Sequence, residues 1–255
     1  MRILILGGTS EASELVRHIA GDGRLHPILS LAGRTANALP SGIETRVGGF
    51  GGVDALVDWL QHNKTQAVID ATHPFAARIS ANAQAATTRL GLSLCTVLRP
   101  EWEATASDRW TNVPDADAAA RELGPQPRRV FLSIGRQSLA AFAAAPQHTY
   151  LIRSIEAPDS ASLPPKVDLI AARGPFDRAS EAALLRDNRI DVLVSKNSGG
   201  TATYPKIEAA RDLGLPVIMI NRPHKACGTA VTTAAEAHAW LIAHHDARTC
   251  SERGV

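Results

Sequence analysis

The chain has 255 residues, of which 45% are hydrophobic and 20% charged, and its formal net charge is +2. This composition is typical of a soluble globular protein with one large domain or two small ones. A net charge this small, without a run of lysines and arginines between aromatic residues, argues against nucleic acid as a partner.

The first predicted elements are a short apolar strand over residues 2–6, a turn at Gly7 and Gly8, and a helix over residues 10–20. Doubly wound α/β domains use this order to hold a phosphate against main-chain N–H groups at the positive end of a helix. If Gly7 is the first glycine of the dinucleotide fingerprint, Thr9 stands at the second position and Ala12 at the last. The alternative is a structural turn capped by Thr9 or Ser10. The residues predicted to bind a nucleotide phosphate are Gly7, Gly8, Thr9, Ser10 and Glu11.

A second strand, residues 28–32, ends in Gly33 and Arg34. NAD enzymes carry an acidic residue here for the ribose 2′-hydroxyl, whereas an arginine suits the 2′-phosphate of NADP. A guanidinium binds such a phosphate bidentately. We therefore expect Gly33 and Arg34 to contact NADPH, and the alternative is a solvated loop arginine.

Strands and helices continue to alternate, which predicts a parallel sheet covered by helices on both faces. A glycine-rich turn at residues 48–52 precedes a helix over 53–62, and buried strands follow at 67–71 and 94–98. A short strand at 110–113 and a helix at 115–123 come before the best linker of the chain, residues 124–127.

The strand at 67–71 stops at Thr72-His73-Pro74, and Pro74 suits the first turn of the next helix. Such a loop lies next to the nicotinamide half of a dinucleotide bound to this kind of sheet. We expect Thr72, His73 and Pro74 to contact the cofactor. His73 can hydrogen-bond a ligand or only cap the loop.

The second half of the chain resembles the first. Residues 129–135 resemble residues 2–8 at an offset of 127, and a helical pattern follows in both. Leu90-Gly91-Leu92 and Arg99-Pro100 recur at an offset of 123. That second offset aligns Thr72-His73 with Ser195-Lys196. A duplicated α/β unit follows, with domains at 1–124 and 125–255 and a cleft between them at the strand ends. The short strands near Val113 and Val231 can stay in their own half or cross to the other.

The loop aligned with Thr72-His73 is rich in donors and glycines, and it predicts an anion cradle for a second phosphate or for substrate carboxylates. The structural alternative is a helix cap with an exposed lysine. The residues of this loop are Ser195, Lys196, Asn197, Ser198, Gly199, Gly200 and Thr201. Arg136, Arg153 and Arg173 also follow predicted strands, and they suggest a basic side for the substrate.

Several signatures are absent from the sequence. It has no P-loop, no Gly-x-Ser-x-Gly elbow, no Tyr-x-x-x-Lys pair and no paired carboxylates for acid–base work. The histidines lack metal-ligand spacing, so no metal site is expected. Three scattered cysteines favour a reduced, cytoplasmic protein. The sequence thus offers groups that position a cofactor and an anion but no obvious catalytic side chain. This suits hydride transfer, in which the cofactor carries the chemistry and the protein supplies orientation and charge.

The three loops together resemble the precorrin-6A reductases of cobalamin biosynthesis. The matching motifs are Leu6-Gly7-Gly8-Thr9-Ser10-Glu11, Asp70-Ala71-Thr72-His73-Pro74-Phe75-Ala76 and Ser195-Lys196-Asn197-Ser198-Gly199-Gly200.

The resemblance implies two Rossmann-like domains and NADPH-dependent reduction of a carbon–carbon double bond in precorrin-6A, which gives precorrin-6B. The candidate proton donors are then Lys196, His73 and Tyr204. The alternatives are a cobalt-containing substrate, as in the anaerobic branch of the pathway, and a protein that senses NADP without turnover.

Overall fold

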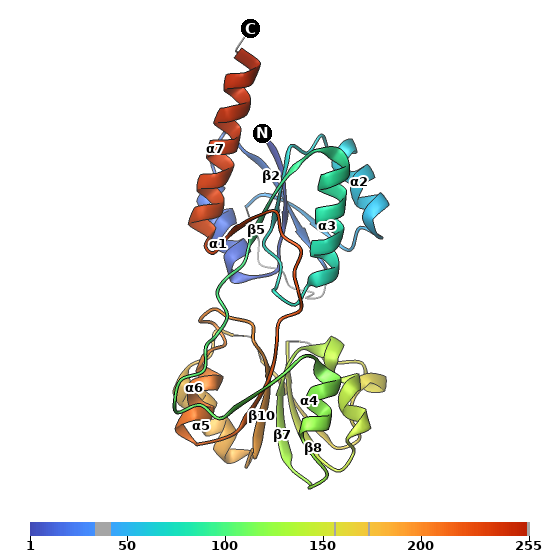
Figure 1. Ribbon diagram of the computed structural model, residues 1–255, viewed down its shortest axis with the longest axis vertical. Helices are drawn as coiled ribbons and strands as arrows, with labels where there is room; N and C mark the ends of the chain where they lie inside the picture. The colour runs from blue at the N-terminus through green and yellow to red at the C-terminus, as the bar shows by residue number, and fades with distance from the viewer. Residues whose placement is uncertain (34–41, 156, 173, 254–255) are drawn as a thin grey trace. The chain divides into compact units, whose positions relative to one another are not determined.

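The computed structural model describes residues 1–33, 42–155, 157–172 and 174–253. The chain divides into two compact units (Figure 1), Met1–Pro100 with Pro223–Val255 and Glu101–Arg222. Over these described residues each unit has one sheet of six strands, and all strand pairs are parallel. This confirms the α/β class and the two parallel-sheet domains.

The sheet of the first unit has the strand order of the doubly wound dinucleotide-binding fold, with the direction of strand succession reversing between β1 and β4. The spatial order of its strands is β12 (Thr229–Val231), β5 (Ser93–Val97), β4 (Ala67–Asp70), β1 (Arg2–Leu6), β2 (His26–Leu31) and β3 (Glu44–Val47). Ligands of such sheets bind at the carboxyl ends of the strands, at this switch point.

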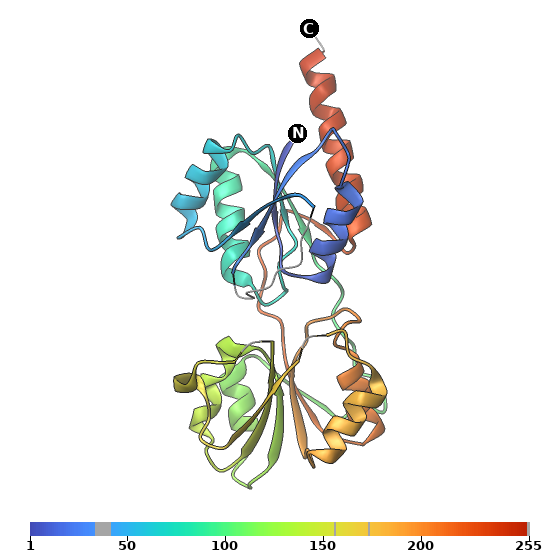
Figure 2. The same ribbon diagram turned by 180° about the vertical axis from the view of Figure 1, so that it is seen from behind.

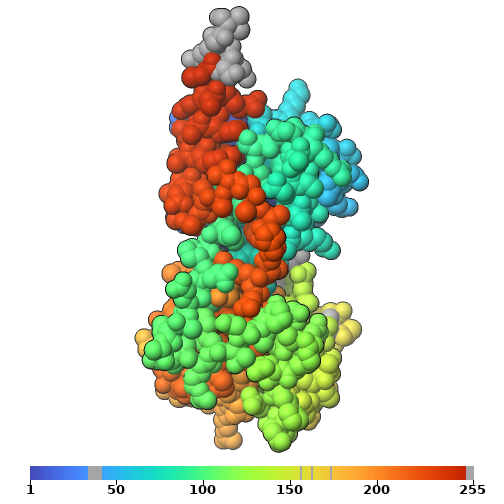
Figure 3. Space-filling model, viewed as in Figure 1, coloured from blue at the N-terminus to red at the C-terminus, as the bar shows by residue number. Residues whose placement is uncertain are grey.

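Helices cover both faces of the first sheet (Figures 1 and 2). They are α1 (Ser10–Ile19) with α7 (Ala234–Arg253) on one face, and α2 (Val53–His62) with α3 (Ala77–Leu90) on the other. The buried residues of α1 are Ala12, Leu15, Val16 and Ile19, which lie on one helical stripe. Leu241 of α7 packs into the same core, while other parts of α7 lie at the surface in Figure 3. In the described part of the chain, no helix is both long and apolar enough to cross a bilayer.

The second unit repeats the strand order of the first. Its strands are, in space, β6 (Trp110–Val113), β11 (Val217–Ile220), β10 (Val192–Lys196), β7 (Arg129–Ser133), β8 (Thr149–Ser154) and β9 (Val167–Ala171). Its α-helices are α4 (Ala116–Glu122), α5 (Arg178–Asp187) and α6 (Pro205–Asp212), and its 3₁₀ helices are η1 (Arg136–Ser138), η2 (Ala140–Ala144) and η3 (Ser160–Ser162).

The strand registers correct one detail of the repeat. Leu6 pairs with Asp70, and its counterpart Ser133 pairs with Ser195. Asp70 therefore corresponds to Ser195 and Thr72 to Asn197, at an offset of 125. The alignment of Thr72-His73 with Ser195-Lys196 was wrong by two residues, because the segments between the matching strands differ in length.

The two short edge strands cross between the halves. β6 follows β5 in sequence but pairs with β11, and β12 follows β11 but pairs with β5. Gly228 permits the docking of β12, because a Cβ there would lie 2.1 Å from the carbonyl oxygen of Leu94. The compact units therefore differ from the division at 124/125: the first unit takes its last strand and helix from the end of the chain.

One predicted helix has a different form. The segment after β7 contains the 3₁₀ helices η1 and η2 where the repeat predicted a counterpart of α1. Pro146 lies two residues beyond η2 and cannot continue a helix, since it lacks an N–H and clashes with the preceding turn.

Candidate functional site

The turn between β1 and α1 has the geometry of a close main-chain approach. A Cβ at Gly7 would lie 2.6 Å from Cδ1 of Leu29, so the chain passes tightly over β2. Gly8 has a φ of +111°, which side chains rarely adopt, and no heavy atom lies within 4 Å of the position of its missing Cβ. The turn thus leaves open space beside Gly8, where main chain can face a ligand.

Thr9 caps α1 and joins two loops of the candidate site. Its hydroxyl oxygen accepts the N–H of Ala12 at 3.1 Å, and its O–H donates to the carbonyl oxygen of Ala71 at 2.8 Å. Because Ala71 follows β4, this side chain holds the β1–α1 turn against the β4–α3 loop. The N–H groups at the start of α1 lack partners within the helix, and they carry the positive end of its dipole.

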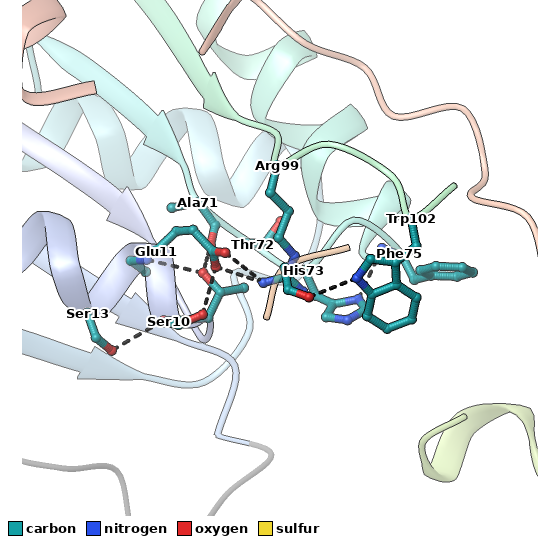
Figure 4. A network of polar contacts seen from close by, with 12 residues as sticks. Ser10, Glu11, Ser13, Ala71, Thr72, His73, Phe75, Arg99 and Trp102 are labelled. Carbon is teal, nitrogen blue, oxygen red and sulfur yellow. Dashed lines mark hydrogen bonds and ion pairs between the residues drawn. The ribbon is translucent and has the colours of Figure 1, made fainter. Parts of the chain in front are cut away.

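Glu11 and Arg99 form an ion pair at the start of α1 (Figure 4). Nη1 of Arg99 lies 2.8 Å from Oε2 of Glu11, and both side chains are largely buried. Ser10 donates to the same carboxylate at 3.1 Å. Burial opposes ionisation of Glu11, but the hydrogen bonds and charge of Arg99 outweigh it, so the pKa of Glu11 falls below its ordinary value of 4.5. Arg99 thus offsets a negative charge that would otherwise repel a phosphate at this helix end.

The β4–α3 loop begins with a buried polar group. Oδ1 of Asp70 accepts the main-chain N–H of Thr72 at 3.0 Å and its O–H at 2.6 Å. Nδ1 of His73 accepts the N–H of Phe75 at 3.2 Å, so the neutral imidazole carries its proton on Nε2. The side chain of His73 is half-buried.

The structure therefore brings together the glycine turn and the start of the β4–α3 loop. Gly33 lies beyond β2 with a φ of +71°, at the same carboxyl edge of the sheet. Pro74 follows His73 in the loop before α3. Arg34, to which the preference for NADP was assigned, lies outside the described residues, and so does Arg173.

In the second unit, some residues of the predicted anion cradle are buried or hydrogen-bonded to other residues of the unit. Ser195 is fully buried in β10. Asn197 makes a two-way contact with the main chain of Trp102: its Oδ1 accepts the Trp102 N–H at 2.8 Å, and its Nδ2 donates to the Trp102 carbonyl at 2.9 Å. The indole N–H of Trp102 donates to the carbonyl of Gly200 at 2.8 Å. These contacts shape the loop that contains Gly199, Gly200 and Thr201.

Other predicted residues of the second unit are more accessible. Lys196, at the end of β10, is half-buried, and Thr201 is exposed, whereas Ser198 is buried. Tyr204 precedes α6, and its oxygen accepts Nη2 of Arg211 at 2.8 Å. Its own proton can therefore point elsewhere.

The two described arginines of the predicted basic side differ. Arg136 is half-buried at the start of η1, beyond β7. Arg153 is 8% exposed, it pairs with Glu181, and its guanidinium lies 3.7 Å from the ring centre of Phe176. The guanidinium of Arg153 is thus already bound inside its unit.

Comparison with known proteins gives concordant matches over nearly the whole chain. The model of the precorrin-6x reductase CbiJ/CobK family matches residues 2–242. A precorrin-6A reductase of Sinorhizobium sp is 52% identical over 221 residues, which are 87% of this chain and 85% of the relative. A solved CobK precorrin-6A reductase has a TM-score of 0.90 at 46% identity, with 96% of this chain and 97% of that chain covered. A cobalt-precorrin-6A reductase of Salmonella typhimurium is 31% identical, with 87% of each chain covered.

The chain belongs to the precorrin-6x reductase CbiJ/CobK family. Membership confirms the resemblance and makes the chain an oxidoreductase. Its Rossmann-like fold is consistent with a nicotinamide cofactor.

Sequence reasoning missed several residues of this reductase site. Arg99 and Arg222 were noticed only as parts of a repeat, yet Arg99 pairs with Glu11 and Arg222 donates to the carbonyl of Asn197 at 2.8 Å. Lys225, which contacts Asp70 and Thr72, gave no signal at all. Trp102 was missed because its partners are nearly a hundred residues away.

Proposed function

We propose that this reductase transfers hydride from NADPH to precorrin-6A and so yields precorrin-6B. The observation that carries the proposal is the 52% identity, over most of both chains, to a relative named precorrin-6A reductase. The lower identity of 31% to a cobalt-precorrin-6A reductase favours the cobalt-free substrate. An assay with both tetrapyrroles tests the cobalt-containing substrate as the alternative.

The first unit suits the nucleotide. Gly8 leaves open space at the amino end of a ten-residue α-helix, whereas the corresponding turn of the second unit leads into a 3₁₀ helix of three residues. A long α-helix presents N–H donors and a dipole to a pyrophosphate, and a single 3₁₀ turn has little dipole to offer. The residues proposed to hold NADPH are Gly7, Gly8, Thr9, Ser10, Glu11, Gly33, Arg34, Thr72, His73 and Pro74.

When bound, NADPH supplies the hydride. The protein's residues then bind and orient the two reactants. His73 is proposed to contact one of them from the β4–α3 loop. In the second unit, Arg136, Lys196, Ser198, Gly199, Gly200 and Thr201 are proposed to bind the carboxylates of the substrate, since ammonium, guanidinium and free N–H groups are the donors that anions prefer.

A proton must also reach the carbon next to the one that accepts the hydride. Lys196, His73 and Tyr204 are the proposed donors, and Lys196 can be tested most cleanly. A Lys196→Ala variant that binds precorrin-6A more weakly but keeps its single-turnover rate of hydride transfer identifies Lys196 as a binding residue. A loss of that rate at saturating substrate identifies it as the proton donor.

The proposed function is tested by mixing the purified protein with precorrin-6A and either NADPH or NADH. We expect absorbance at 340 nm to fall with NADPH and the tetrapyrrole to gain the mass of a hydride and a proton. Faster turnover of cobalt-precorrin-6A indicates the alternative substrate. Binding of NADP without turnover of either tetrapyrrole indicates a sensing protein and contradicts the proposal.

The choice of NADPH over NADH is tested at Arg34. Hydrogen bonds to a charged group contribute about 1.5–3 kcal/mol, so Arg34→Ala should raise the KM for NADPH roughly tenfold to a hundredfold. The KM for NADH should change little, because NADH lacks the 2′-phosphate. Equal effects on both cofactors contradict the assignment.

The location proposed for this enzyme is the cytoplasm. Its cysteines are free in the described residues, where Cys95 is buried and Cys227 and Cys250 are exposed. Exposed free thiols persist in a reducing compartment, which also maintains NADPH.

A further inference from the structure

The segment that returns from β11 to β12 carries a buried lysine. The side chain of Lys225 is 3% exposed, and its ammonium lies at the end of β4 in the first unit. Its Nζ lies 3.1 Å from the carbonyl oxygen of Thr72, 3.2 Å from the Thr72 hydroxyl and 3.4 Å from Oδ1 of Asp70. Asp70 is the last residue of β4, and Thr72 belongs to the start of the β4–α3 loop.

Asp70 and Lys225 hold Thr72 from two sides. The carboxylate of Asp70 is 1% exposed, and it accepts both the N–H and the O–H of Thr72. A buried ion pair adds little net stability over apolar residues of similar volume, because both charges must leave water. What such a pair does supply is a fixed direction for the groups it binds. Here those groups belong to the residue that precedes His73.

The second unit holds its equivalent loop in a comparable way. Trp102 and Lys225 each lie three residues after the arginine of an Arg-Pro pair, in a segment that enters a unit. Trp102 binds Asn197, and the strand registers make Asn197 the counterpart of Thr72. The same position of each loop is thus held by the same position of the entering segment, through the side chain of Lys225 in the first unit and through the main chain of Trp102 in the second.

We propose that Lys225 is a positioning residue for the cofactor-facing loop of the reductase. It fixes the main chain of Thr72, so that His73 meets the nicotinamide half of NADPH without reorganisation of the loop. The proposal rests on the proposed binding of NADPH by this unit. Lys225 itself touches neither reactant.

Two variants separate positioning from stability. Lys225→Met leaves the carboxylate of Asp70 buried without its cation, and the protein should melt at a lower temperature. The double variant Lys225→Met/Asp70→Asn removes that charge, and it should regain part of the lost melting temperature. It does not restore the bonds from Nζ to Thr72.

Two readouts decide between the roles. The dissociation constant of NADPH is measured by fluorescence titration, and hydrogen exchange of residues 71–76 is measured on the protein without ligand. We expect both variants to bind NADPH roughly tenfold more weakly, since small misplacements of binding groups carry large costs. Their loop amides should exchange faster. Leu60→Ala, a change in the core under α2, serves as a control that lowers stability and leaves both readouts as in the wild type.

Wild-type NADPH affinity and wild-type exchange in the double variant would overturn the proposal, because Lys225 would then act through stability alone. If the wild-type protein itself binds no NADPH, the proposed function fails instead. The exchange measurement still decides the case for Lys225, because it needs no cofactor.

Discussion

Cys95 lies in β5 within the core of the first unit, and burial raises the pKa of its thiol to about 12. The thiolate is the reactive form of cysteine, so a buried thiol with a raised pKa resists modification. Cys227 and Cys250 are exposed. We predict that Ellman's reagent titrates two thiols rapidly in the native protein at pH 8 and a third only after unfolding. Rapid reaction of three native thiols would contradict this core.

The pair of Glu11 with Arg99 predicts a pH-dependent contribution to stability. The pKa of Glu11 is lowered in the folded protein, so the folded state binds fewer protons at Glu11 than the unfolded state does. The stabilisation is then complete above the unfolded pKa and lost as the pH falls through the folded one. Glu11→Gln should lower the free energy of unfolding by about 1 kcal/mol at pH 7. The difference should shrink towards zero below about pH 4.

Urea unfolding of both proteins at several pH values measures this difference. Asp54→Asn is a suitable control, because its partner Arg89 and Asp54 itself are both well exposed. Such exposed pairs contribute little. A difference between wild type and Glu11→Gln that is the same at pH 7 and pH 3 contradicts the account of this pair.

At the scale of single residues, the sequence shows which side chains are present but not which partners they contact. Arg153 follows a strand, as a substrate ligand could, but its partner Glu181 is 28 residues away and no local pattern links them. Asn197 stands in a donor-rich loop, yet its amide is used by the main chain of Trp102. Thr9, by contrast, was predictable as a cap, because N-cap chemistry is local.

Among the elements, α1 gives the clearest prediction. Its cap, Thr9, also binds the carbonyl of Ala71. Loss of an N-cap costs about 0.5–2 kcal/mol, and loss of a further hydrogen bond adds to this cost. We predict that Thr9→Ala lowers the free energy of unfolding by about 2 kcal/mol, whereas Thr9→Ser, which keeps the hydroxyl, changes it by under about 0.5 kcal/mol. Equal effects in urea denaturation would show that the hydroxyl does not act as described.

Most elements were predictable, because apolar runs and glycine turns alternate with helical periodicity along much of the chain. The prediction of an α-helix after β7 was wrong, because the segment forms two 3₁₀ helices, and Pro146 stands two residues beyond the second of them. The alignment of β4 with β10 failed by two residues, because pairing between strands and not sequence similarity sets the register.

At the scale of the whole molecule, the reciprocal edge strands predict which fragments fold. Residues 101–222 contain every strand and helix of the second unit, whereas residues 125–255 lack β6 and carry β12 and α7 without their sheet. We predict that the fragment 101–222 unfolds cooperatively on heating, as followed by circular dichroism, and that the fragment 125–255 does not. Equally cooperative melting of both fragments would contradict this division.

The duplication itself was visible in the sequence, but the exchange of edge strands was not. The Arg-Pro pairs and the Leu-Gly-Leu junctions are local patterns, and they recur late in each half. The partner of a three- or four-residue strand is decided by distant residues. One such residue is Leu94, whose carbonyl lies where a side chain at Gly228 would have to be.

We propose that NADPH lies across the glycine turn of the first unit, and a crystal structure of the protein with NADP⁺ tests this placement most directly. We predict the pyrophosphate within hydrogen-bonding distance of the main-chain N–H groups of Thr9 and Ser10, with the nicotinamide beside the loop of Thr72 and His73. Nucleotide bound in the second unit, with the turn from Gly7 to Glu11 empty, would contradict the account.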